Sequence, residues 1–209
     1  MTKQPLQYQT IKQIIERQTD KRAKLFLAMQ YALASRCGEL LPYQHYKTNK
    51  QTHQLELAHE SFGLKKENIY KTKGVWVCEI PNFKNSNQTF KKPFIIPEEE
   101  FIFQPFIEWY ESDQKHFSDV RERMYRIIVS SCLPFDNASH ILRHSRATHL
   151  SEIFGFSAYE IKDFLGHANL QTSSVYVHTD LTRMAEKMKS NILSMREVGN
   201  NEKVEYEEA

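Results

Sequence analysis

The chain has 209 residues, of which 40% are hydrophobic and 26% charged, which is enough for a folded core and argues against a disordered chain. The mean hydropathy of −0.61 and the absence of a long apolar run exclude a membrane-spanning helix. Residues 1–9 lack the apolar stretch of a secretion signal. Three cysteines, Cys37, Cys78 and Cys132, are an odd number without metal-binding spacing. They predict reduced thiols in a cytoplasmic protein.

The net charge of +2 is unevenly distributed along the chain. Segment 197–209 contains five glutamates and one lysine, so 27 basic and 21 acidic residues remain in 1–196. A moderately basic body permits a nucleic-acid partner, although solvated lysines alone give the same balance. We expect a single domain over 1–196 and an acidic, disordered tail over 197–209, because no repeat or Gly/Ser-rich linker divides the chain.

The N-terminal part contains two helix signals. Thr10 and Gln13 have the spacing of a capping box that opens a short helix. Asp20 is the expected N-cap of a more apolar helix that ends near Gly38, with Arg36 in its last turn. Residues 39–74 are polar, and we expect irregular chain there with one helical turn within 61–67.

The middle of the chain predicts strands and the remainder predicts helices. Two apolar runs, 75–80 and 90–96, flank a turn that contains Lys84, which is typical of an antiparallel β-hairpin. The expected fold class is therefore mainly α with a small hairpin or three-stranded sheet (α+β). Five later helices are expected. The first begins near Pro97, and the next two cover 118–131 and 138–154. A short fourth helix lies between a Ser157–Glu160 capping box and Gly166, and the last covers 180–192.

The stretch S-H-I-L-R-H-S-R-A-T-H-L, residues 139–150, is the most informative. On a helix, His140, Arg143 and His144 lie at i, i+3 and i+4 and share one face. That spacing alone is weak, because a basic helix face is usually only solvated. A zinc site built from these and the other histidines is disfavoured, since the spacing matches no standard pattern.

Three further motifs strengthen the interpretation: A-S-R-C-G-E-L-L around Arg36, L-G-H ending at His167, and T-S-S-V-Y-V-H around Tyr176. In this order, together with the lysine hairpin, they resemble the tyrosine recombinase (phage integrase) family. The resemblance extends over the family's catalytic domain, roughly from Gln9 to Met195. A separate N-terminal DNA-clamping domain, common in that family, is expected to be absent from this chain.

The resemblance implies a role for each matching residue. Tyr176 would be the nucleophile and Glu39 would orient the site. The hairpin lysine would be Lys84, with Lys91 or Lys92 as alternatives. The full set of implied catalytic residues is Arg36, Lys84, His140, Arg143, His167 and Tyr176.

These residue types suit strand cleavage by a tyrosine. Two guanidiniums supply fixed positive charge to the phosphate oxygens in the transition state. A histidine can take the phenol proton, and a lysine can protonate the departing 5′-hydroxyl. The covalent 3′-phosphotyrosyl link would conserve the bond energy, so no cofactor, metal or ATP is expected.

The resulting hypothesis is a site-specific DNA recombinase or integrase that acts on double-stranded DNA without membrane contact. Self-association on DNA is expected to use the C-terminal helix, with Leu181, Met184 and Met188 as its anchor; docking of that helix within its own domain is the alternative. Two other functions stay open. One is DNA relaxation of the type IB topoisomerase kind, and the other is a non-catalytic DNA-binding protein.

Overall fold

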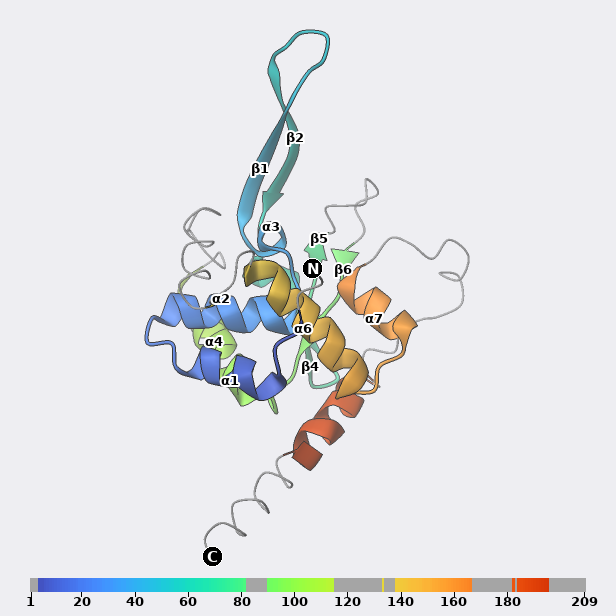
Figure 1. Cartoon of the computed structure of the whole chain (residues 1–209). Coiled ribbons are helices and arrows are strands. Elements are labelled where there is room, and N and C mark those ends of the chain that lie inside the picture. The colour runs from blue at the N-terminus through green and yellow to red at the C-terminus, as the bar shows by residue number, and fades with distance from the viewer. Residues whose placement is uncertain are drawn as a thin grey trace, which may run out of the picture.

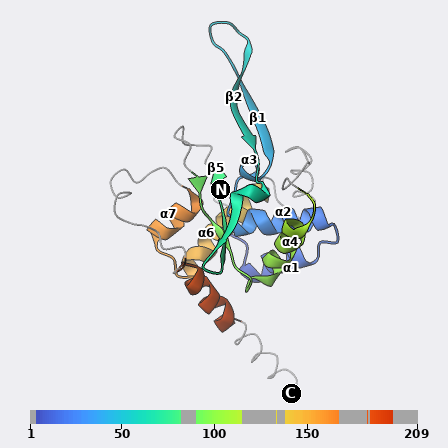
Figure 2. The same cartoon turned by 180° about the vertical axis from the view of Figure 1, so that it is seen from behind.

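The protein is described from a computed structural model, which covers residues 4–81, 90–114, 133, 138–166, 182 and 184–195. Helices surround a small sheet, and a long β-hairpin projects from this body (Figures 1 and 2). This arrangement confirms the expected α+β class. The helices are α1 (Tyr8–Glu16), α2 (Lys21–Ala32), α3 (Cys37–Leu40), η1 (a 3-10 turn, Lys66–Asn68), α4 (Glu100–Glu111), α6 (Ala138–Glu152), α7 (Ala158–Leu165) and a last helix over 184–195.

Helix α2 lies at the centre of the body because its apolar side chains point in every direction. Every residue from Leu25 to Ala32 is buried. The helix packs against α1, α4 and α6. As predicted, Asp20 caps it: the carboxylate accepts hydrogen bonds from the backbone N–H groups of Arg22 and Ala23.

The hairpin predicted around Lys84 is confirmed on both sides of its turn. Strand β4 (Val75–Cys78) pairs antiparallel with β7 (Phe94–Ile95), and β5 (Ile80–Pro81) pairs with β6 (Phe90–Lys91). Strand β3 (Ile69–Thr72) adds to β4, so the three-stranded sheet has the order β3-β4-β7. The turn itself, with Lys84, lies outside the described residues.

The prediction of irregular chain over 39–74 is wrong for most of that segment. Strands β1 (Pro42–Thr48) and β2 (Leu55–Phe62) form an antiparallel ribbon of their own, here called the β1–β2 arm (residues 42–62), which stands clear of the body (Figure 1). Tyr46, Leu55 and Leu57 on its outer half are 50%, 71% and 48% exposed. Because these apolar residues are exposed to solvent, the arm lacks the buried face by which a strand is usually recognised in a sequence. The helical turn expected within 61–67 is found slightly later, as η1 (Lys66–Asn68), and residues 61 and 62 belong to β2.

Two N-terminal boundaries also differ from the prediction. Helix α1 begins at Tyr8 with Gln7 as N-cap and without a side-chain cap, so the Thr10–Gln13 capping box is wrong. Tyr8 is buried and donates a hydrogen bond to Glu99 (3.1 Å), which places the first turn of the helix against the core. Helix α2 ends at Ala32, and Arg36 is the N-cap of the separate helix α3.

The later helices follow the sequence signals more closely. Helix α4 begins at Glu100, three residues beyond Pro97, and α6 ends at Glu152. The Ser157–Glu160 capping box of α7 is confirmed, and so is its stop at Gly166, which has φ 63°. The expected helix over 118–131 lies outside the described residues.

The last helix, 184–195, leaves the body at the end opposite the β1–β2 arm (Figures 1 and 2). Met184, Met188 and Ile192 are buried against their own domain, the arrangement expected if the helix docks within one chain; Leu181 lies outside the described residues. Among the helices that the structure describes, none has the length and apolar composition needed to cross a membrane.

Candidate active site

The site is built around the C-terminal end of α2. The backbone N–H groups of Ala34 and Ser35 bond to the carbonyls of Tyr31 and Gln30 (3.0 and 3.2 Å), the pattern of a Schellman motif. Ala34 has φ 45°, a left-handed conformation usually taken by glycine. The chain therefore turns sharply after Leu33, and the carbonyls of Leu33 and Ala34 become acceptors for side chains from distant elements.

Glu39 holds Arg36 at two points. The Glu39 carboxylate accepts a hydrogen bond from the Arg36 guanidinium (Oε1, 2.8 Å) and another from the Arg36 backbone N–H (Oε2, 3.0 Å). The Glu39 side chain is fully buried, whereas that of Arg36 is 23% exposed. The guanidinium is thus fixed from behind and keeps one side open to solvent.

Arg143 reaches the same carboxylate from α6. Its Nη1 lies 3.9 Å from Glu39 Oε2 and donates to the Ala34 carbonyl, while its Nη2 donates to the carbonyl of Leu165 (2.9 Å). Burial lowers the pKa of Arg143 to about 10, with Glu39 acting in the opposite direction, so the group is charged at neutral pH. The fold therefore brings together Arg36 and Arg143, as the sequence predicts.

Lys91, on β6, completes this cluster. Its ammonium lies 3.2 Å from Glu39 Oε2 and donates to the carbonyls of Leu33 (2.9 Å) and Ala34 (3.2 Å). The side chain is fully buried. Burial lowers the pKa of Lys91 to about 8, an effect that Glu39 opposes and Arg143 reinforces.

The other predicted residues are placed as follows. His140 lies in the first turn of α6, three residues before Arg143, and is exposed; His144 is exposed as well. Lys92 pairs with Glu79 (3.2 Å) at the surface. The remaining three, Lys84, His167 and Tyr176, lie outside the described residues and stay predictions.

A second buried charge cluster, which was not predicted from the sequence, lies beside the site. Arg146, one turn along α6 from Arg143, forms two 2.7 Å hydrogen bonds with Glu99. Its guanidinium carbon lies 4.9 Å from the centre of the Tyr31 ring. The available signal is spacing: Leu142, Arg146 and Leu150 repeat every four residues, and all three are buried, so Arg146 occupies a core position of α6.

The cluster of Arg36, Lys91 and Arg143 has two positive charges in excess over Glu39. Such a group of fixed donors, closed on the protein side and open at Arg36, is suited to an anionic group such as a phosphodiester. Within the described part of the chain, no three His, Cys, Asp or Glu side chains group as metal ligands.

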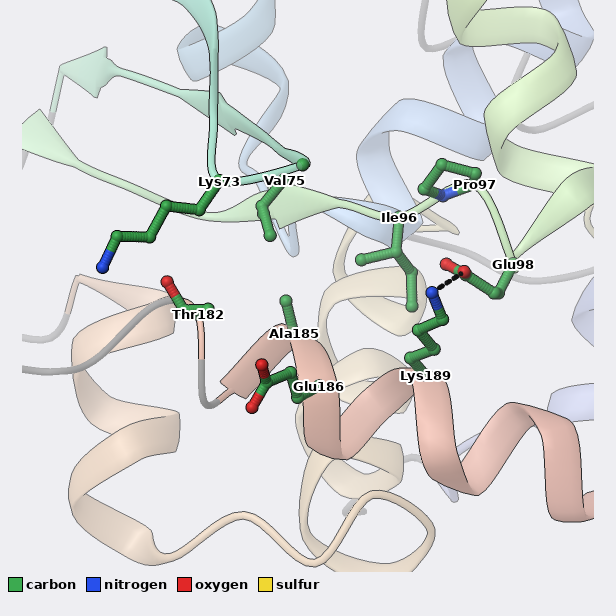
Figure 3. Close-up of a pocket in the computed structure, with 10 residues that line it drawn as sticks. Lys73, Val75, Ile96, Pro97, Glu98, Thr182, Ala185, Glu186 and Lys189 are labelled. Atoms are coloured by element: carbon green, nitrogen blue, oxygen red, sulfur yellow. Dashed lines mark ion pairs between the residues drawn. The ribbon is translucent and has the colours of Figure 1, made fainter.

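A separate pocket lies where the last helix meets the sheet. It has a volume of about 260 Å³ and is lined on one side by the β3–β4 turn and on the other by Ala185, Glu186 and Lys189. Figure 3 shows Lys189 reaching across to Glu98, at 2.9 Å. This pocket therefore marks where the last helix docks, and neither Arg36 nor Arg143 lines it.

Curated relatives match short segments of the chain. Tyrosine recombinase XerC of Alcanivorax borkumensis is 39% identical over 69 residues, which are 33% of this chain and 22% of the relative. Tyrosine recombinase XerC of Brucella suis is 34% identical over 83 residues, or 40% of this chain and 26% of the relative. The matched segments thus span about a quarter of these relatives.

Solved structures match most of the chain. Crystal structures of the XerH site-specific recombinase, bound to difH substrate before cleavage and to palindromic difH substrate after cleavage, align with a TM-score of 0.54. Their identities are 18% and 19%, and the alignments cover 87% of this chain but only 52% and 51% of theirs. This likeness establishes the fold. The phage integrase family profile matches residues 4–183, so the chain belongs to the phage integrase family.

Proposed function

We propose that this chain is the catalytic part of a tyrosine recombinase that cleaves and rejoins double-stranded DNA. The observation that carries the proposal is the convergence of Arg36 and Arg143, 107 positions apart in the sequence, on the single carboxylate of Glu39. Two forked donors with a common anchor form a site for the two non-bridging oxygens of a phosphodiester.

In the proposed reaction, the Tyr176 oxygen attacks the scissile phosphorus. A 3′-phosphotyrosyl bond forms, and the bond from phosphorus to the 5′-oxygen breaks. His140 or His167 takes the phenol proton, and Lys84 gives a proton to the departing 5′-oxygen. Arg143 donates to the carbonyl of Leu165, which ties the end of α7 to the arginines. Attack by a 5′-hydroxyl on the phosphotyrosine reverses the step and rejoins a strand.

The partners follow from this proposal. The chain would bind double-stranded DNA in the cytoplasm, with residues 1–196 as the catalytic unit and the acidic segment 197–209 as a tail. Self-association would use helix 184–195, which would leave its place beside the pocket of Figure 3 and take the same place on a neighbouring copy. An exchanged helix buries Met184 and Met188 as well as a retained one does, so the exchange would require little intrinsic free energy.

The experiment is a covalent capture that requires no known target site. Protein is incubated with duplexes that carry a nick next to a randomised segment, so that cleavage releases a short 5′-hydroxyl strand and religation fails. Protein-linked DNA is recovered under denaturing conditions and sequenced. We expect enrichment of one sequence class by wild type and none by Tyr176→Phe. An equal yield of linked DNA from both proteins, or none from wild type, would refute the proposal.

A further inference from the structure

Lys91 differs from the lysine that the reaction needs as a proton donor. Its ammonium is surrounded by the carboxylate of Glu39 and the carbonyls of Leu33 and Ala34, and no part of the side chain is exposed. A proton donor must reach the leaving oxygen, and the three acceptors around Lys91 lie on the protein side of the site.

Lys91 and the Arg143 guanidinium share two acceptors. Arg143 and Lys91 both donate to the Ala34 carbonyl, and both face Glu39 Oε2, at 3.9 and 3.2 Å. Lys91 is the nearer of the two cations to Glu39 Oε2 and neutralises that oxygen. The hydrogen bonds of Arg143 go instead to the carbonyls of Ala34 and Leu165.

The conformation of Ala34 supports the same conclusion. A left-handed φ is unfavourable at an alanine and persists where surrounding contacts impose it. Here the conformation directs the Ala34 carbonyl so that it accepts hydrogen bonds from Lys91 on β6 and from Arg143 on α6. The strained residue thus links the two cations, which come from elements far apart in the chain.

We infer that Lys91 is a positioning residue: it neutralises Glu39 Oε2 and holds the Leu33 and Ala34 carbonyls, so that the guanidinium of Arg143 stays available to the phosphate. Without the ammonium, Glu39 loses one of its cations and two buried carbonyls lose a donor. The Arg143 guanidinium then moves to hydrogen-bond with the Glu39 carboxylate. The effect on catalysis rests on the proposed function, whereas the effect on Arg143 does not.

The kinetic test compares Lys91→Met with Lys71→Met, which removes an exposed lysine of β3. The probe is the nicked duplex enriched by wild type, prepared with oxygen or with sulfur at the 5′ bridging position. A thiolate leaves without a proton donor, because a thiol has a much lower pKa than an alcohol. We expect Lys91→Met to slow adduct formation about 10–100-fold on both duplexes, as for other residues that orient a reacting group through a neighbour.

Three results would overturn the inference. Recovery of the rate on the sulfur duplex would make Lys91 the proton donor, an unchanged rate on both duplexes would remove any role, and an equal loss in Lys71→Met would make the effect nonspecific.

A crystal structure of Lys91→Gln, which keeps a polar donor if the methionine variant fails to fold, gives a readout independent of activity. We expect the separation between Arg143 Nη1 and Glu39 Oε2 to fall from 3.9 Å to hydrogen-bonding distance. If Arg143 does not move, the inference is refuted, whether or not wild type forms an adduct. Absence of an adduct from wild type refutes the proposed function instead.

Discussion

Arg146 and Glu99 form a bidentate ion pair, with both hydrogen bonds 2.7 Å long, in which both side chains are buried. The pair joins α6 to the start of α4. Tyr8 adds a hydrogen bond to Glu99, and the rings of Tyr31 and Phe154 flank the guanidinium.

Removal of Arg146 alone should strongly destabilise the fold. Arg146→Met leaves the Glu99 carboxylate buried without its cation, and we expect the free energy of unfolding to fall by about 3–5 kcal/mol. Urea denaturation measures this loss. The double variant Arg146→Met/Glu99→Gln removes the stranded charge and should recover a large part of it. A double variant no more stable than the single one would contradict the argument.

His149 should make stability sensitive to acid. Burial lowers the pKa of His149 to about 4, an effect reinforced by Arg146, while its Nδ1 lies 2.7 Å from the Tyr31 hydroxyl. Between pH 6.5 and about 4 the unfolded chain binds a proton at this residue and the folded chain does not. The free energy of unfolding should therefore fall as the pH is lowered through this range.

The measurement is urea denaturation of wild type and His149→Gln at several pH values. Glutamine cannot titrate but can still accept a hydrogen bond from Tyr31. The variant should show a shallower decline between pH 6.5 and 4, because it lacks the titrating group that distinguishes the two proteins. Parallel curves would exclude His149 as a source of the acid sensitivity.

The β1–β2 arm should be dispensable for folding. Its strands pair with each other, and the chain closes at its base through the hydrogen bond from the Leu64 N–H to the Leu40 carbonyl (3.0 Å). Replacement of residues 44–60 by Asn-Gly joins the paired positions 43 and 61 through a two-residue turn. We expect the free energy of unfolding to change by less than about 1 kcal/mol. A loss above about 2 kcal/mol would mean that the arm stabilises the body.

Gly63, directly after the arm, provides the contrasting case. It has φ 71°, and a Cβ there would lie 2.7 Å from the Leu40 carbonyl oxygen. Gly63→Ala should therefore destabilise the protein by more than about 1 kcal/mol, because both the backbone conformation and the contact are unfavourable. A thermal melt unchanged from wild type would show that the neighbouring backbone can move aside.

Features encoded within a few residues are the ones that the sequence predicts well. The caps at Asp20 and Ser157 and the stop at Gly166 each depend on groups two to four positions away. Glu99 and Arg146 are 47 positions apart, and no local pattern connects them. The β1–β2 arm is not predicted because its apolar residues are exposed, so no buried face marks its strands in the sequence.

The same distinction applies to the site. Motif order implies that Arg36 and Arg143 meet, and the fold brings both to Glu39. The contacts of Lys91 depend on a left-handed alanine and on strand pairing, which the motifs do not encode. The roles of Lys84, His167 and Tyr176 remain predictions from the motifs.

The central claim is that Tyr176 attacks a phosphodiester held by Arg36 and Arg143. The most direct measurement is mass spectrometry of the protein–DNA adduct after digestion by trypsin and nuclease. We expect a nucleotide 3′-phosphate on the peptide that contains Tyr176, with fragment ions that place it on that tyrosine, and loss of the adduct in Arg143→Ala. A nucleotide attached to any other residue, or an adduct that forms equally well without Arg143, would contradict it.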